Sequence, residues 1–211
     1  MVMEIKFHGE DIRLLPSGAL MIMSEHVLVL ADLHLGKGVQ LRDHGVPLID
    51  QLDTKTILKL HADLKKYQPK TCIICGDLMH VQSRHLSQQL QWFNNELMPY
   101  DCRFVLTEGN HDQDMTHDLS KIEIVDFFDV NQIRCSHFPM EGRPNIAGHL
   151  HPGVRLQKGR VGKVYKAFAV DDVGIVCPAY GHYTGAYAKL AGKKQFFACY
   201  GKDVRYVSAE L

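Results

Sequence analysis

The segment VLVLADLH, residues 27–34, joins an uninterrupted apolar run to an Asp-x-His cluster. A continuous apolar run of this length is typical of a β-strand that is buried on both faces. The same arrangement returns in TCIICGD, residues 71–77, and in RFVLTEGNHD, residues 103–112. We therefore expect three buried strands, each of which delivers polar side chains at its carboxyl end.

Two stretches between these strands have helical periodicity. The first follows Pro47 and ends near Tyr67, and its apolar residues fall on roughly one face: Ile49, Leu52, Ile57, Leu60 and Leu64. The second is stopped by Pro99, and its apolar stripe consists of Leu86, Leu90, Phe93 and Leu97. Later segments have mostly strand character, beginning with 122–125, 132–136 and 145–147. This order predicts an α/β fold in which the sheet becomes mixed or a second sheet packs on the first.

Length and composition are those of one globular domain. The 211 residues correspond to a single domain, 1–211, with 45% hydrophobic and 23% charged residues. No apolar run approaches the roughly 20 residues of a membrane span. Charged residues interrupt residues 1–20, so we expect no signal peptide and a cytoplasmic location. Cys72 and Cys75 form the one close cysteine pair, and their apolar surroundings favour core positions over a redox or zinc motif.

Charge is distributed unevenly, although the formal net charge is zero. Residues 1–151 contain 14 basic and 20 acidic side chains, whereas residues 152–211 contain 10 basic and 4 acidic ones. One tract has five basic residues and no acidic one: Arg155, Lys158, Arg160, Lys163 and Lys166. We interpret it either as a solvated hairpin or as a patch for a polyanion, in which Arg155, Lys158 and Arg160 would bind substrate.

Five short polar clusters each follow an apolar strand. They are Asp32-Leu33-His34, Gly76-Asp77, Gly109-Asn110-His111-Asp112, His137 and Gly148-His149-Leu150-His151. In open α/β sheets, binding sites form beyond the carboxyl ends of the strands. If the five strands share one sheet end, all five clusters converge there. Each cluster alone could be a polar turn, so the prediction depends on their combination.

The residue types in these clusters are those of a dinuclear metal site. Two carboxylates, one amide and four imidazoles are available, and mixed N and O ligands suit first-row divalent ions. No thiolate is among them, which argues against a closed structural zinc site. Seven side chains are too many for one ion but suit two ions if a carboxylate bridges them. The candidate ligands are Asp32, His34, Asp77, Asn110, His137, His149 and His151.

Over residues 31–151, these motifs resemble those of the calcineurin-like metallophosphoesterases. Residues 32–36 are similar to the opening motif of the SbcD-type nuclease branch. The wider match is to the small bacterial ligase-associated DNA damage response endonucleases. It extends over the segments 31–37, 76–80, 148–152 and 177–185. The resemblance implies two packed mixed β-sheets flanked by helices.

The resemblance also implies how the ligands are shared between two divalent ions. The first ion would be bound by Asp32, His34 and His151, the second by Asn110, His137 and His149, and Asp77 would bridge both. Manganese is the expected ion, with iron, zinc or magnesium as alternatives. A hydroxide that bridges the ions would attack phosphorus.

Two further residues receive catalytic roles from the resemblance. His111 would bind no metal; it would contact the scissile phosphate and protonate the leaving oxygen. Asp112 would hold the His111 ring in place. Because His111 and the ligand set are complete, we give little weight to a scaffold protein that has kept the fold and lost the chemistry.

The substrate is less strongly indicated than the chemistry. Protein phosphatases of this superfamily extend the second motif to Gly-Asp-x-x-Asp-Arg-Gly, whereas here Gly76-Asp77 is followed by Leu78-Met79-His80. We therefore expect a manganese-dependent nuclease or phosphodiesterase that acts on DNA in a repair setting. The alternative is a phosphodiesterase or pyrophosphatase for small nucleotides, which the zero net charge favours. The resemblance also suggests a DNA ligase and a helicase as functional neighbours, and a homodimer.

Overall fold

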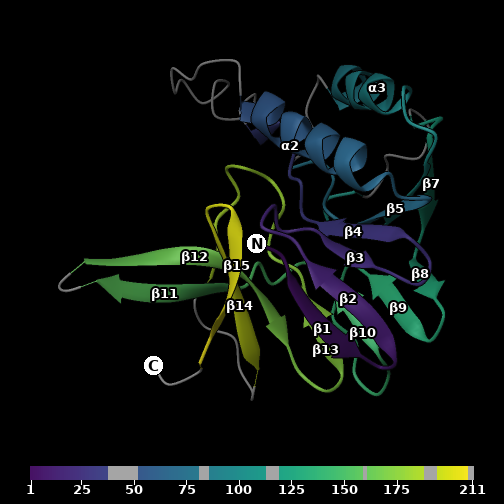
Figure 1. The fold of residues 1–211 in the computed structure, drawn as a ribbon. Coiled ribbons are helices and arrows are strands. Elements are labelled where there is room, and N and C mark those ends of the chain that lie inside the picture. The colour runs from purple at the N-terminus through teal and green to yellow at the C-terminus, as the bar shows by residue number, and fades with distance from the viewer. Residues whose placement is uncertain (38–51, 81–85, 113–118, 159–160, 188–193, 209–211) are drawn as a thin grey trace.

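The computed structural model describes residues 1–37, 52–80, 86–112, 119–158, 161–187 and 194–208 (Figure 1). Its first sheet contains seven strands that neighbour one another in chain order. They are β1 (Met3–Phe7), β2 (Glu10–Leu14), β3 (Leu20–Ile22), β4 (Val27–Ala31), β5 (Thr71–Cys75), β6 (Arg103–Thr107) and β7 (Ile122–Val125). The pairs from β1 to β4 are antiparallel, and the pairs from β4 to β7 are parallel.

The second sheet contains eight strands in the order β15-β14-β12-β13-β10-β9-β8, with β11 paired to β12. They are β8 (Phe127–Val130), β9 (Ile133–Ser136), β10 (Asn145–Ala147), β11 (Gly153–Lys158), β12 (Val161–Val170), β13 (Gly174–Val176), β14 (Gln195–Tyr200) and β15 (Asp203–Val207). The strands β9, β10 and β13 are mutually parallel, and the remaining pairs are antiparallel.

The first sheet is buried on both faces. On one face, Leu28 and Leu30 of β4 pack in a core beneath helices α2 (Leu52–Tyr67) and α3 (Leu86–Leu97), which lie together above this sheet in Figure 1. On the other face, Val29 packs with Ile146 and Phe168 of the second sheet. The alternation of side chains along a strand thus sends neighbouring residues of β4 into two different cores. This explains why its sequence is apolar throughout.

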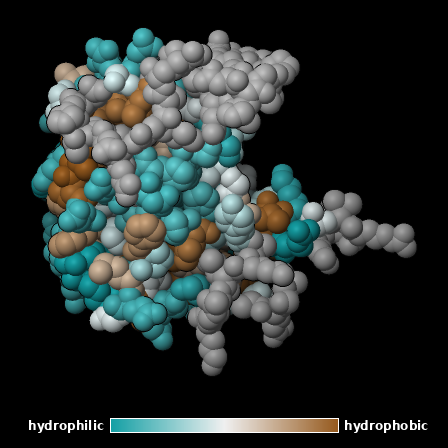
Figure 2. Space-filling model, turned by 180° about the vertical axis from the view of Figure 1, so that it is seen from behind, coloured by the Kyte–Doolittle hydropathy of each residue, from teal (hydrophilic) through white to brown (hydrophobic). Residues whose placement is uncertain are grey.

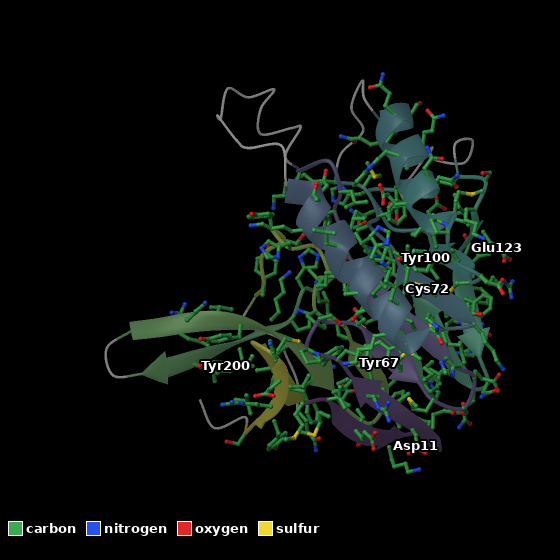
Figure 3. All side chains as sticks on the ribbon, turned by 45° about the horizontal axis from the view of Figure 1, so that its top comes forward. Asp11, Tyr67, Cys72, Tyr100, Glu123 and Tyr200 are labelled. Carbon is green, nitrogen blue, oxygen red and sulfur yellow. The ribbon has the colours of Figure 1, made fainter. Side chains whose placement is uncertain are left out.

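The predicted α/β fold with two packed mixed sheets and flanking helices is confirmed. The strands predicted at 122–125 and 145–147 have these bounds, and the one predicted at 132–136 begins one residue later. The predicted helix after Pro47 is described from Leu52 onward, and Ile49 lies outside the described residues. Cys72 and Cys75 are buried in β5, as predicted, and Figure 3 shows Cys72 beneath α2.

The structure decides between the two arrangements that the sequence left open, a single mixed sheet and two packed sheets, in favour of the second. The five strands that carry the polar clusters do not belong to one sheet, because β4, β5 and β6 lie in the first sheet and β9 and β10 lie in the second. Contacts between these loops nevertheless bring the five strand ends together. The amide of Gly148 after β10 donates to the carbonyl of His137, and the amide of His149 donates to the Asp32 carboxylate after β4.

The strands β11 and β12 form a hairpin that extends away from the two sheets, as Figures 1 and 2 show. It begins at Gly153, two residues after His151, so its base adjoins the polar clusters. Within the described residues, neither helix is long and apolar enough to cross a membrane.

Candidate metal centre

The loops that follow β4, β5, β6, β9 and β10 bring their histidines and carboxylates into three overlapping groups. The ligand atoms within each group all lie within 4.8 Å of one another. The groups are Asp32, His34 and His151; His34, Asp77 and His111; and Asp77, His137 and His149. Side chains that are far apart in the sequence therefore converge on one small volume.

In the first group, the two imidazole Nε2 atoms and one carboxylate oxygen lie close together. The Nε2 atom of His34 lies 3.2 Å from Nε2 of His151, which lies 3.3 Å from Oδ1 of Asp32. The Asp32 side chain is fully buried and accepts hydrogen bonds from the backbone amide of His149, at 2.9 and 3.1 Å. These bonds fix the carboxylate against the two imidazoles.

The third group is centred on His137, which is 1% exposed. Its Nδ1 lies 3.2 Å from the carbonyl oxygen of Cys75, which can only accept a hydrogen bond, so Nε2 is the ring nitrogen that faces the other candidate ligands. That Nε2 lies 3.1 Å from Oδ1 of Asn110 and 3.1 Å from Nδ1 of His149. Asn110 therefore lies next to this group, with its amide oxygen facing His137.

Asp77 lies between His34 of the first group and His137 of the third. Its Oδ2 is 3.6 Å from Nε2 of His34, and its Oδ1 is 3.5 Å from Nε2 of His137. The backbone amide of His111 donates to the same Oδ1 at 3.1 Å. The two oxygens of one buried carboxylate thus face two sets of imidazoles, which is the geometry that a bridging ligand requires.

Backbone strain is concentrated in these loops. Nine non-glycine residues have a positive φ in the described part of the chain, and five of them belong to the predicted ligand set. These five are Asp32 (54°), His34 (46°), Asp77 (51°), His149 (66°) and His151 (44°). Each such conformation costs of the order of 1–3 kcal/mol and persists where the surrounding structure enforces it, often at functional sites.

The close approach of the loops also requires glycine at two positions. A Cβ atom on Gly76, which has φ +71°, would lie 2.2 Å from Nδ1 of His137. A Cβ atom on Gly148 would lie 2.6 Å from Oδ2 of Asp32. The glycines in the sequence motifs are therefore there to let carboxylate and imidazole approach the backbone.

The donor set fits divalent metal ions. Burial, and then the neighbouring His151, His80 and His111, lowers the pKa of His34 to about 2, and burial is the main cause that lowers the pKa of His149. Both rings are therefore neutral near pH 7 and have lone pairs available for a cation. Carboxylate, amide and imidazole donors suit first-row divalent ions.

The structure places His111 close to the ligand groups. Its ring centroid lies 5.4 Å from that of His34, and one ring nitrogen falls within the second group. His80 was not among the predicted site residues, yet its ring lies 5.9 Å from that of His111 and 5.4 Å from that of His34. The only signal for His80 in the sequence was its place at the end of the Gly76-Asp77 motif.

The predicted role of Asp112 needs correction. Its carboxylate oxygens accept hydrogen bonds from the backbone amides of Leu78 (2.9 Å) and Gly109 (3.0 Å), and the described contacts include none with the His111 ring. Burial raises the pKa of Asp112 to about 6. Asp112 therefore joins the loop after β5 to the loop after β6, and it positions Asp77 and Asn110 rather than a catalytic imidazole.

The basic tract does not form one patch. In the β11–β12 register, Arg155 pairs with Val164 and Lys163 pairs with Leu156, so Arg155 and Lys163 lie on opposite faces of the hairpin. Both are exposed. Lys166 points inward, and its Nζ donates to the carbonyls of Ala179 (2.7 Å) and Gly181. Arg160 and the side chain of Lys158 lie outside the described residues.

The loop that follows β13 of the second sheet packs against the end of β4 and the candidate ligand Asp32. The amides of Tyr180 and Gly181 donate to the carbonyls of Ala31 (2.7 Å) and Asp32 (3.0 Å). The Nζ atom of Lys59, in α2, donates to the carbonyl of Tyr180 and lies 3.6 Å from the centre of its ring. Sequence reasoning missed Lys59, because a lysine in an amphipathic helix is ordinarily solvated.

Comparison with known proteins identifies the family. The profile of the calcineurin-like phosphoesterase family matches residues 25–195. The chain belongs to this family. The predicted enzyme class, a metal-dependent phosphoesterase, is thereby confirmed, and the ligand groups described above are its candidate sites for divalent ions.

Two solved structures are similar to this calcineurin-like phosphoesterase. The Pseudomonas putida nuclease MPE superposes with a TM-score of 0.79 at 22% identity, over 98% of this chain and 100% of that one. Yfce, a phosphoesterase from E. coli, superposes with a TM-score of 0.42 at 13% identity, over 86% and 97%. The first of these confirms the two-sheet fold. A comparison with curated protein sequences gives no match.

The buried ammonium of Lys59 predicts a pH dependence of stability. Burial lowers the pKa of Lys59 to about 7, whereas the unfolded chain keeps the ordinary value near 10.5. Between these values the unfolded state binds more protons, so this residue makes the phosphoesterase more stable as pH rises from 7 to 10. Its contribution to the free energy of unfolding should grow by up to ~1.4 kcal/mol per pH unit.

Urea unfolding of wild type and Lys59→Met at pH 7, 8 and 9 measures this contribution. The difference between the two free energies of unfolding should widen with pH in favour of wild type. Lys65→Met, which changes an exposed lysine of the same helix, should show no such widening. A constant difference between wild type and Lys59→Met would mean that Lys59 stays charged in the folded protein.

Proposed function

We propose that this phosphoesterase is a two-metal-ion phosphodiesterase that cleaves DNA, with manganese as the native ion. The observation that carries the proposal is the position of Asp77, whose two oxygens face His34 on one side and His137 on the other. One ion would be held by Asp32, His34 and His151, the other by Asn110, His137 and His149, with Asp77 shared. The absence of the phosphatase arginine after Gly76-Asp77 and the similarity to the Pseudomonas putida nuclease MPE support a diester substrate.

When bound, two divalent ions would neutralise the phosphate oxygens and lower the pKa of water enough for it to attack phosphorus at neutral pH. The chain's own residues supply the rest. Asp32 and Asp77 are held by backbone amides, so little reorganisation is needed when the phosphate binds. His111 is partly exposed beside His34, where it can protonate the leaving oxygen.

The wider setting follows from the family resemblance. A DNA repair role, with a ligase and a helicase as functional neighbours, a homodimer and a cytoplasmic location belong to this proposal. The alternative substrate, a small nucleotide, differs in needing no contact with an extended phosphate backbone. Substitutions in the β11–β12 hairpin therefore test which of the two substrates the protein cleaves.

The bridging role of Asp77 is tested by Asp77→Asn. A neutral amide cannot balance two dications, so we expect fewer metal ions per chain and a large loss of turnover. Elemental analysis of the purified protein, together with hydrolysis of bis-p-nitrophenyl phosphate, measures both. Asp11→Asn, at an exposed position in β2, serves as the control and should change neither. Full occupancy with normal turnover would exclude Asp77 as a ligand.

His111→Ala separates metal binding from catalysis. We expect both ions to remain and turnover of DNA to fall by roughly 10²-fold or more, since a deoxyribose alkoxide is a poor leaving group. Hydrolysis of bis-p-nitrophenyl phosphate should suffer less, because p-nitrophenolate leaves without a proton. Equal losses on the two substrates would refute the general-acid role, and loss of metal would make His111 a ligand.

Arg155 tests whether the substrate is DNA or a small nucleotide. The face of the hairpin that carries Arg155 also carries Lys166, which reaches the loop beneath Asp32, so this face continues toward the metal centre. Arg155→Gln should weaken DNA binding and make its salt dependence shallower by about one unit. Lys163→Gln, on the opposite face, is the matched control. If neither variant changes DNA binding or cleavage, the small-nucleotide alternative is favoured.

A further inference from the structure

Two exposed aromatic rings lie against the candidate ligand histidines. Phe138 is 48% exposed, and its ring centroid is 4.6 Å from the rings of both His137 and His149. Tyr187 is 65% exposed, and its ring is 6.1 Å from that of His151, with the two planes 23° apart. Each ring therefore covers the outer side of one ligand group and leaves much of its surface open to solvent.

Both rings stand on backbone that is held in place. The amide of Tyr187 donates to the carbonyl of His151, and the carbonyl of Tyr187 accepts from the amide of Gly153, both at 2.9 Å. The carbonyl of Phe138 accepts a hydrogen bond from the Ser136 hydroxyl at 2.8 Å. An exposed ring on fixed backbone loses little conformational entropy when it binds a partner.

Two other exposed aromatic rings, those of Phe127 and Tyr200, are covered by arginine side chains. The guanidinium of Arg134 lies 3.4 Å from the ring centre of Phe127, and that of Arg205 lies 4.6 Å from the ring centre of Tyr200. Tyr200, labelled in Figure 3, lies near the base of the hairpin. Among the described residues, no cation lies over Phe138 or Tyr187. Their faces are therefore available to a planar, uncharged group.

The two rings belong to different halves of the centre. Tyr187 lies beside His151 of the first group, and Phe138 lies beside His137 and His149 of the third. The two oxygens of Asp77 face His34 of the first group and His137 of the third. A phosphodiester that binds at Asp77 has one nucleoside on each side. We propose that Phe138 and Tyr187 are the stacking surfaces for the two nucleobases that flank the scissile phosphate. This inference rests on the proposed phosphodiesterase function and names the part of the substrate that each ring recognises.

Stacking on a ring does not depend on the identity of the base, because every base has a π-face. Removal of a stacking ring typically reduces affinity by roughly 5- to 150-fold per base. The proposal therefore predicts tolerance of base sequence together with a strong requirement for a base on each side. A site that recognised the phosphate alone would not show this requirement.

The test is a thermodynamic cycle that combines protein variants lacking an aromatic ring with substrate analogues lacking a base. The variants are Phe138→Leu and Tyr187→Leu, which keep an apolar side chain, and Tyr187→Phe, which keeps the ring. The substrates are the thymidine dinucleotide and two analogues in which one nucleoside is replaced by an abasic deoxyribose. Metal content per chain and kcat/KM are measured with manganese for every pair. Tyr206→Leu, an exposed ring of β15, is the matched control.

We expect each leucine variant to lose roughly 5- to 150-fold in kcat/KM on the intact dinucleotide, at unchanged metal content. One variant should lose much less on the analogue without the 5′ base, and the other on the analogue without the 3′ base. Tyr187→Phe, which keeps the ring, should retain most of the kcat/KM that Tyr187→Leu loses, and Tyr206→Leu should behave like wild type.

Two results would overturn the inference while the proposed function stands. Wild type could cleave all three substrates equally well, or the leucine variants could lose the same factor on every substrate because the rings only support the ligands. If wild type with manganese cleaves no diester at all, the proposed function fails, and the stacking proposal fails with it.

Discussion

Asp32 is the residue on which the assembly of the site depends. Its backbone amide donates to the carbonyl of Gly76, its carbonyl accepts from the amide of Gly181, and its carboxylate accepts from the amide of His149. One fully buried residue thus ties the end of β4 to a loop of its own sheet and to two loops of the other sheet. A buried carboxylate is tolerated only where such bonds replace water. The two sheets are therefore held together at the edge that carries the candidate metal ligands.

The same arrangement explains why the loops are strained. Several imidazoles and two carboxylates are packed within a few ångströms of one another, and five of these residues have a positive φ. Such a cluster is costly for the folded chain, and a cation that binds only the folded state offsets that cost. A divalent ion bound here would therefore stabilise the folded chain, because its candidate ligands come from several loops that meet only when the chain is folded.

Much of this could be predicted from the sequence because the signals are local. The apolar runs predicted β4, β5 and β6, and the glycines and polar residues after them predicted which side chains would converge. The sheet to which β9 and β10 belong could not be predicted, because an apolar run does not indicate which other strands it will pair with. The bonds of Asp112 to the amides of Leu78 and Gly109 were missed for the same reason, since they join loops that are distant in sequence.

The candidate metal ligands and the proposed substrate-binding groups lie on different parts of the fold. The candidate ligands lie on short turns at the ends of buried strands, where packing leaves them little freedom. The hairpin and Tyr187 lie outside this core, yet the bonds of Tyr187 to His151 and Gly153 connect them directly to the first ligand group. Two hydrogen bonds therefore join Tyr187 to the backbone at the candidate ligand His151 and at Gly153, where the hairpin begins. A substrate that stacked on the ring of Tyr187 would consequently act on the backbone that carries His151.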